Sequence, residues 1–139
     1  MTSDRLARGY LRRGRARRQA LDTLMRTESF ADVVRESQEV VELLLKGALR
    51  FAGIDPPKRH DVRSALLRAL DRFPPDLRDE LRELAQASSR LAEERAQALY
   101  GDEEAMIDAS ELFTAEDGHR ALSVVDRVLV VCSRLLGEG

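Results

Sequence analysis

The sequence predicts an all-α protein: a single up-and-down bundle of about five helices in one domain spanning residues 1–139. Alanine, leucine, arginine and glutamate dominate the chain, aromatic residues make up 4% and tryptophan is absent, a composition that favours helices over strands. Apolar residues recur every three or four positions along most of the chain. A length of 139 residues suits one domain, and no internal repeat divides it.

The first two helices are expected at residues 4–26 and 30–52. The break between them is so short that they should form an antiparallel hairpin. Gly9 and Gly14 weaken the early part of the first helix. The second helix is apolar nearly all round, which predicts a place in the middle of the bundle. Gly53 is the candidate for its C-terminal cap.

Three further helices complete the prediction. Pro56 and Pro57 prevent continuation, so a third helix is expected at about 60–72, capped by Asp61. A fourth is expected at about 76–98, followed by a loop or short helical turn over 101–113. Thr114 caps a last helix that runs to about residue 136, with acidic residues in its first turn. Within the fourth helix, Arg95 continues an apolar stripe and should point inward or at an interface.

The charge of the chain is unevenly distributed. Residues 1–26 contain eight arginines and two aspartates, a net charge of +6, so the remainder carries −8. One interpretation pairs these arginines with the acidic body or with a second subunit. The other is a phosphate-binding surface for RNA or DNA. Its candidates are Arg8, Arg12, Arg13, Arg15, Arg17 and Arg18. No aromatic residues interleave with them, so base stacking is not supported.

Several kinds of chemistry are not expected. The single Cys132 excludes an intramolecular disulfide and a cysteine-based zinc cluster, and its apolar surroundings predict a small buried hydrophobe. Two histidines are too few for a multi-histidine metal site, and no glycine-rich phosphate loop is present. We therefore expect no metal and no cofactor. With no signal peptide and no apolar run approaching about 18 residues, the sequence predicts a cytoplasmic protein without a membrane span.

Polar residues interrupt the apolar second helix at a regular spacing. Gln38, Glu42 and Lys46 are four residues apart and so share one stripe of the helix. Polar groups in such a helix must be paired to avoid a cost of about 1–3 kcal/mol each. Glu42 and Lys46 are therefore expected to form a buried or interface ion pair.

The pattern of this stretch resembles the HEPN (higher eukaryotes and prokaryotes nucleotide-binding) domain family. The residues that carry the resemblance are Gln38, Glu42, Lys46, Leu49, Gly53, His60 and Asp61. The resemblance implies a helical bundle that forms a homodimer and binds nucleotides or RNA. Many members of the family are metal-independent ribonucleases, with an arginine followed after four to six residues by a histidine.

This chain departs from the ribonuclease signature. At the expected position it has Arg95, four residues, and then Tyr100 in place of histidine. A phenol is protonated at neutral pH and is a poor general base, so the ribonuclease activity is not carried over. The arrangement resembles a branch of the family with an Arg-Tyr-Pro-like element. Gly101 replaces that proline, and Gly118 replaces an alanine in the later pattern from Thr114 to Leu122.

Together, these features predict a nucleotide- or RNA-binding accessory protein without catalysis of its own. Lys46, His60, Arg95 and Tyr100 are the candidates for a phosphate-binding site or an interface; alternatively, His60 caps or braces the loop before the third helix. The resemblance further implies a small nucleotidyltransferase as partner, in some cases as a toxin–antitoxin pair, with Tyr100 as a candidate for modification by AMP. The alternatives are a metal-independent ribonuclease toxin and a purely protein-binding helical module.

Overall fold

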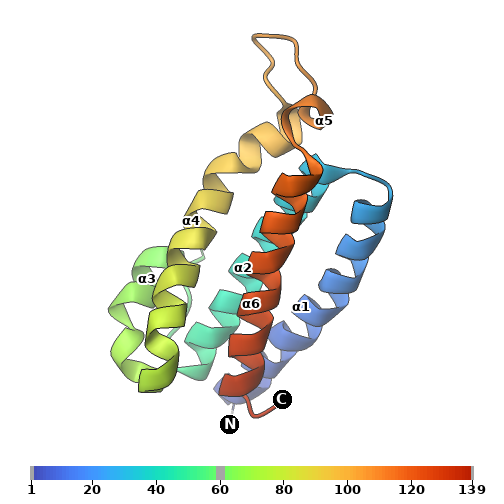
Figure 1. Ribbon diagram of the computed structural model, residues 1–139. Helices are drawn as coiled ribbons and strands as arrows, with labels where there is room; N and C mark the ends of the chain where they lie inside the picture. Colours follow the sequence, from blue (N-terminus) through green and yellow to red (C-terminus); the bar gives the residue numbers. More distant parts are fainter. Residues whose placement is uncertain (1, 59–61, 139) are drawn as a thin grey trace.

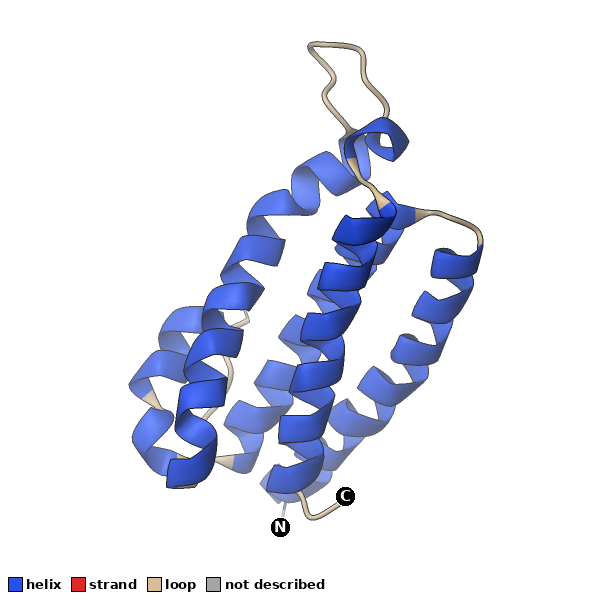
Figure 2. Ribbon diagram, in the orientation of Figure 1, coloured by secondary structure: helices blue, strands red, loops and turns tan. Residues whose placement is uncertain are grey.

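The computed structural model describes residues 2–58 and 62–138, and this part of the chain contains helices but no strand (Figure 2). The α-helices are α1 (Thr2–Arg26), α2 (Phe30–Phe51), α3 (Val62–Arg68), α4 (Arg78–Tyr100), α5 (Ala109–Leu112) and α6 (Ala115–Leu135). The four long helices α1, α2, α4 and α6 run alternately up and down (Figure 1). The predicted all-α bundle is therefore confirmed.

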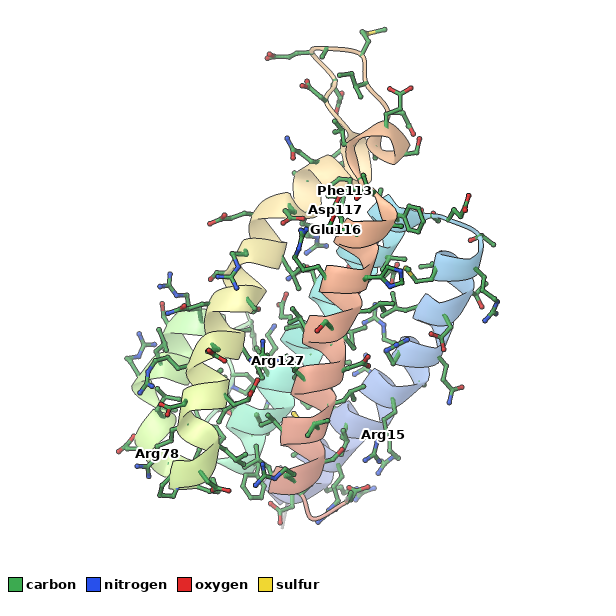
Figure 3. All side chains as sticks on the ribbon, viewed as in Figure 1. Arg15, Arg78, Phe113, Glu116, Asp117 and Arg127 are labelled. Atoms are coloured by element: carbon green, nitrogen blue, oxygen red, sulfur yellow. The ribbon has the colours of Figure 1, made fainter. Side chains whose placement is uncertain are left out.

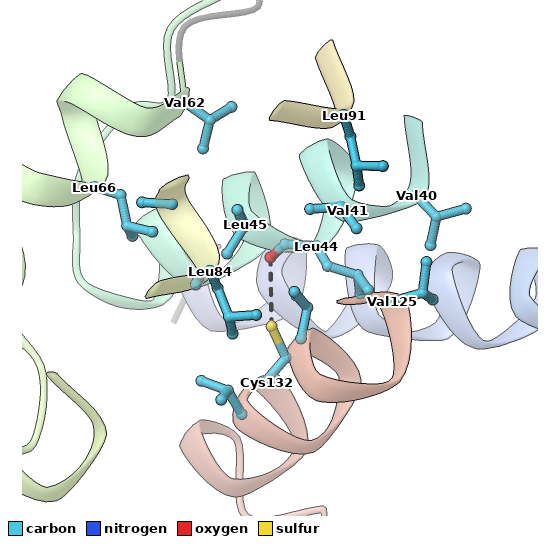
Figure 4. Close-up of a cluster of buried hydrophobic side chains, with 14 of the residues drawn as sticks. Val40, Val41, Leu44, Leu45, Val62, Leu66, Leu84, Leu91, Val125 and Cys132 are labelled. Atoms are coloured by element: carbon cyan, nitrogen blue, oxygen red, sulfur yellow. Dashed lines mark hydrogen bonds between the residues drawn. The ribbon is translucent and has the colours of Figure 1, made fainter. Parts of the chain in front are cut away.

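Helix α2 occupies the centre of the bundle, as its nearly continuous apolar surface predicts. It packs against α1, α4 and α6, and its side chains Val40, Val41, Leu44 and Leu45 are at most 1% exposed. Figure 4 shows these residues facing side chains of α3, α4 and α6. Burial of a valine or leucine contributes about 1.5–3 kcal/mol, so α2 supplies much of the stability of the bundle.

Glycines allow α1 and α2 to approach each other closely. A Cβ atom at Gly47 would lie 2.9 Å from the Cβ atom of Tyr10, and one at Gly14 would overlap the side chain of Leu44. The two glycines therefore sit where one helix presses against the other. Gly14, which we expected only to weaken α1, lies within an uninterrupted helix and makes this contact possible.

The helix ends largely follow the predicted signals. Gly53 has a φ of +80°, and Ile54 N–H donates to the Leu49 carbonyl at 2.9 Å, the hydrogen bond of a Schellman cap. The predicted third helix at 60–72 is shorter than expected: α3 ends at Arg68, and a separate 3₁₀ turn covers Leu70–Arg72. A second 3₁₀ turn, Pro75–Leu77, precedes α4. His60 and the predicted cap Asp61 lie outside the described residues.

Between α4 and α6 the chain forms a projecting loop and the short helix α5 (Figure 1). Thr114 then caps α6 as predicted. Its Oγ1 accepts a hydrogen bond from Asp117 N–H at 3.4 Å, and its own N–H donates to Asp117 Oδ2 at 2.8 Å, which together form a capping box. Within the described residues, no helix has the length and apolar character needed to cross a membrane.

Candidate functional site

The polar stripe of α2 forms a short chain of hydrogen bonds. Gln38 Nε2 donates to Glu42 Oε2 at 2.9 Å, and Lys46 Nζ donates to Glu42 Oε1 at 3.0 Å. Gln38 is 1% exposed and Glu42 is 7% exposed, whereas the Lys46 side chain is 18% exposed. The stripe thus runs from the buried interior towards the surface. The expected Glu42–Lys46 ion pair is present, with its lysine at the outer end.

The outer end of this stripe lies in a surface pocket of about 300 Å³ between α1 and α4, with α2 as its floor. The pocket is lined by Arg17 from α1, by Glu39, Glu42, Leu43 and Lys46 from α2, and by Arg95 from α4. Three cationic side chains from three different helices therefore converge on one depression. Arginine and lysine side chains that converge in this way can bind phosphate without a glycine-rich loop or a metal.

Each cation in the pocket has a carboxylate partner on α2. Glu39 accepts from Arg17 Nη2 at 2.9 Å and from Arg95 Nη2 at 3.3 Å, and Arg17 also reaches Glu36 at 3.1 Å. The side chains of Arg17 and Arg95 are about one-third exposed, a setting in which an ion pair contributes about 0–1 kcal/mol. A dianionic phosphate can compete with carboxylates that are held so weakly.

The other two predicted site residues are not part of this pocket. Tyr100 is 64% exposed at the last position of α4 and does not line the pocket. It lies five positions after Arg95, which places the two side chains about 140° apart around the helix axis. His60 lies outside the described residues. The structure therefore brings Lys46 and Arg95 together but leaves Tyr100 on a different surface.

The glycine that follows Tyr100 explains the departure from an Arg-Tyr-Pro-like element. Gly101 has a φ of +73°, which proline cannot adopt because its ring fixes φ near −65°. A Cβ atom at this position would also overlap the carbonyl oxygen of Ile107. Gly118 is less constrained: a Cβ atom there would lie 3.0 Å from the Met25 sulfur, so this side chain would have to shift slightly.

The six candidate arginines of α1 divide into two groups. Arg8 and Arg15 bind Glu138, while Arg17 contacts α2 and Arg18 binds Asp126 of α6 at 2.7 Å. These four connect α1 to the rest of the bundle, and Figure 3 shows Arg15 projecting from α1. Arg12 and Arg13 are exposed, and neither makes a salt bridge within the described part of the chain. Of the six candidates, Arg12 and Arg13 are therefore the two whose charge is not already paired in the described part of the chain.

Sequence reasoning missed Glu39 and the place of Arg17 in the pocket. Glu39, Leu43 and Lys46 follow one another at intervals of four and three residues, so they share one face of α2. That spacing was a usable signal for Glu39. Nothing in the sequence indicated that Arg17, on another helix, would meet this face, because the contact depends on how α1 packs against α2.

The fold and this pocket, which is lined by three cations and their carboxylate partners, place the protein in the class of all-α helical-bundle domains. A family model described as "HEPN domain" matches residues 7–135, and the chain belongs to the HEPN domain family. This membership suggests a function related to nucleotides or RNA. No curated protein and no solved structure matches the chain.

Proposed function

We propose that this HEPN-domain protein binds a nucleotide or RNA phosphate in the pocket formed by Arg17, Lys46 and Arg95, and that it acts as an accessory without catalysis of its own. The observation that carries the proposal is the convergence of these three cations, each from a different helix, on one pocket. A volume of about 300 Å³ lies at the lower end of the range for small-molecule sites. It can hold a phosphate group and part of a nucleoside.

The chemistry of the pocket suits phosphate. Arg17 and Arg95 offer planar guanidinium groups that can donate paired hydrogen bonds to phosphate oxygens, and Lys46 adds a point charge. Leu43 supplies apolar surface beside them. Binding exchanges the carboxylate partners of the two arginines for the ligand, while Lys46 stays beside Glu42. Glu39 is then free to turn towards water.

The proposal of no catalysis rests on Tyr100 in place of the signature histidine and on the positions of the two proton-transferring candidates that the structure describes. Tyr100 is outside the pocket, and His119 lies exposed near the start of α6, beside a different surface depression. Neither residue lines the pocket that contains Arg95. The competing ribonuclease function predicts RNA cleavage in the presence of a metal chelator. We expect none, and cleavage that Arg95→Ala abolishes would contradict an accessory role.

The binding experiment compares two arginines of α4. ATP and a short single-stranded RNA are titrated into the wild-type protein, Arg95→Ala and Arg90→Ala by isothermal calorimetry. Arg90 is exposed on the same helix and serves as the matched control. Loss of a charge-assisted hydrogen bond worth about 1.5–3 kcal/mol should weaken binding about 10- to 100-fold in Arg95→Ala and leave Arg90→Ala unchanged. Equal effects of both substitutions, or no binding to wild type, would reject the proposal.

The family resemblance also leads us to propose a homodimer and a small nucleotidyltransferase as its partner, the two proteins forming a toxin–antitoxin-like or related system. The exposure of Tyr100 supports it as an acceptor of AMP, because an enzyme could reach its hydroxyl. Light scattering coupled to size exclusion tests the dimer, which predicts twice the 15.6 kDa chain mass. A transferase encoded beside this protein, purified with it and ATP, should add one AMP to wild type and none to Tyr100→Phe.

A further inference from the structure

One end of the bundle carries an excess of negative charge. Residues 96–119 contain no lysine or arginine. They include seven acidic residues: Asp102, Glu103, Glu104, Asp108, Glu111, Glu116 and Asp117. Arg120, which follows directly, pairs with Glu116 and Asp117, so the five carboxylates of the loop and α5 are the ones without a basic partner in the described part of the chain. In space these residues form the end of α4, the projecting loop, α5 and the start of α6 (Figure 1), and Figure 3 shows Glu116 and Asp117 at this end. We call this region the acidic end.

The acidic end also exposes large apolar side chains. Leu99 is 47% exposed, Tyr100 is 64% exposed and Met106 is 90% exposed. Elsewhere in the described chain the large hydrophobic residues exposed to this degree are Leu6 and Val130, one on α1 and one on α6. Three of the five exposed large hydrophobic residues of the described chain thus fall within eight residues of sequence, and exposed apolar side chains that gather at one site mark interaction surfaces.

The loop that presents Met106 is held in a defined shape. Asp102 and Ile107 exchange two backbone hydrogen bonds of 2.9 Å, and Ala105 N–H donates to Asp102 Oδ1 at 3.1 Å. Met106 has a φ of +59°, a left-handed conformation that is unfavourable for a residue with a side chain. The hydrogen-bonded hairpin thus holds Met106, the last residue of its turn, in an unfavourable conformation with its side chain exposed to solvent.

From these observations we infer that the acidic end is a docking surface for a partner protein that presents an apolar pocket surrounded by basic residues. Methionine is a flexible, polarizable side chain that fills such pockets, and apolar residues at the centre of an interface dominate its energetics. The surrounding carboxylates attract a basic rim and raise the association rate. They repel the phosphates of nucleic acid, so RNA does not fit this surface.

This surface is distinct from the phosphate pocket. None of Leu99, Tyr100 and Met106 lines the pocket of Arg17, Lys46 and Arg95, and the loop projects away from the bundle (Figure 1). Docking at the acidic end therefore does not require an empty pocket. Docking at the acidic end does not depend on nucleotide binding in the pocket, so either activity can be absent while the other is present.

The experiment begins with site-specific photo-cross-linking in cells that naturally produce the protein. A benzophenone amino acid is placed at position 106 and, as the control, at position 130. Val130 is 59% exposed but lies on the body of α6. The expected result is one discrete protein adduct from position 106 that position 130 does not give. Its partner, identified by mass spectrometry, should carry a basic surface.

The identified partner is then purified and its affinity for four variants is measured. Met106→Asp and Glu103→Lys/Glu104→Lys should each weaken binding at least about tenfold. Gly101→Ala should weaken it too, although it keeps every contacting side chain, because the added Cβ atom overlaps the Ile107 carbonyl and displaces the hairpin. Glu93→Lys, an exposed site earlier on α4, should leave binding unchanged.

Several outcomes would overturn the inference. They are no adduct from position 106, the same adduct from position 130, an adduct only with nucleic acid or with a second copy of this chain, and unchanged affinity in Met106→Asp. Circular dichroism of each variant checks that the bundle is folded, and unchanged ATP binding checks the phosphate pocket separately.

Discussion

The Glu39 carboxylate of α2 and the Arg95 guanidinium of α4 lie 3.3 Å apart, although 56 residues separate them in the sequence. The same carboxylate binds Arg17 of α1 at 2.9 Å. Glu39 therefore holds two arginines from opposite flanks of the pocket. In the binding mode that we propose, Glu39 competes with the phosphate for both arginines.

Replacing Glu39 with glutamine should tighten phosphate binding. Glu39→Gln keeps the shape of the side chain but removes the negative charge that neutralises Arg17 and Arg95. We expect an affinity for ATP about 3- to 10-fold higher, equivalent to about 0.7–1.4 kcal/mol, as measured by calorimetry. Glu36→Gln is the comparison. Of the arginines in the pocket, Glu36 binds Arg17 but not Arg95, so this substitution should increase the affinity less. Weaker binding in Glu39→Gln would place the ligand elsewhere.

The close contact between α1 and α2 predicts an unusual response to alanine. Gly47→Ala brings a Cβ atom within 2.9 Å of the Tyr10 Cβ atom, which moves only with its helix. Overpacking of this kind costs about 1–3 kcal/mol, more than the gain of about 1 kcal/mol in helix propensity. Denaturant unfolding should therefore show a less stable protein.

The matched control for Gly47 is Gly9. The nearest atom to a Cβ atom there is Arg12 Nη2 at 3.9 Å, so Gly9→Ala should raise stability by about 0.5–1 kcal/mol. If both substitutions stabilised the protein, the helices would not be in the close contact that the structure describes.

The capping box of α6 predicts a specific dependence on pH. Hydrogen bonds from the Thr114 backbone and hydroxyl lower the pKa of the Asp117 carboxyl. A carboxyl with a lowered folded-state pKa stabilises the protein above its unfolded pKa of about 3.9, and this stabilisation is lost as the pH falls through the folded value. Asp117→Asn should therefore lose less stability than wild type on acidification below about pH 4.

Thr114→Ala isolates the other half of the capping box. It removes the hydroxyl that accepts from Asp117 N–H and should cost about 1 kcal/mol at neutral pH. Thermal unfolding of both single variants and the double variant measures their coupling. Fully additive effects would argue against reciprocal bonding between these two residues.

Burial determines the reactivity of the single cysteine. The Cys132 thiol is fully enclosed between α6 and α2, donates to the Leu44 carbonyl at 3.4 Å (Figure 4), and has its pKa raised to about 12 by burial. The nucleophilic thiolate is thus suppressed in the native protein. A disulfide-forming reagent at pH 8 should label Cys132 of the native protein only as fast as the protein unfolds around it. The same reagent should label the unfolded protein within seconds to minutes. Rapid labelling of native protein would contradict this packing.

The fold could be predicted largely because its signals are local. The apolar circumference of α2, the glycine at 53 and the cap at Thr114 each act within a few residues, and all three predictions are confirmed. The end of α3 at Arg68 could not be read in the same way. Residues 69–72 have helix-compatible side chains, and the change to a 3₁₀ turn depends on the packing of this segment.

Only part of the candidate site could be predicted from the sequence. Lys46 follows from its spacing to Glu42, and Arg95 from the apolar stripe that it continues. The place of Arg17 in the pocket depends on tertiary packing. The hairpin that carries Met106 depends on a turn stabilised by a side chain. Neither feature has a periodic signal in the sequence. The roles of the site residues remain predictions for the binding experiments.

The central position of α2 has a consequence for synthesis on the ribosome. Helices α1 and α2 can pair as soon as both have emerged, but the α2 surface around Val40 and Leu44 faces α6 (Figure 4), which is translated last among the helices. Until then the nascent chain exposes an apolar strip that invites aggregation. A chain whose synthesis stops before residue 115 would therefore be an aggregation-prone fragment that needs chaperones. It would not be a smaller functional protein.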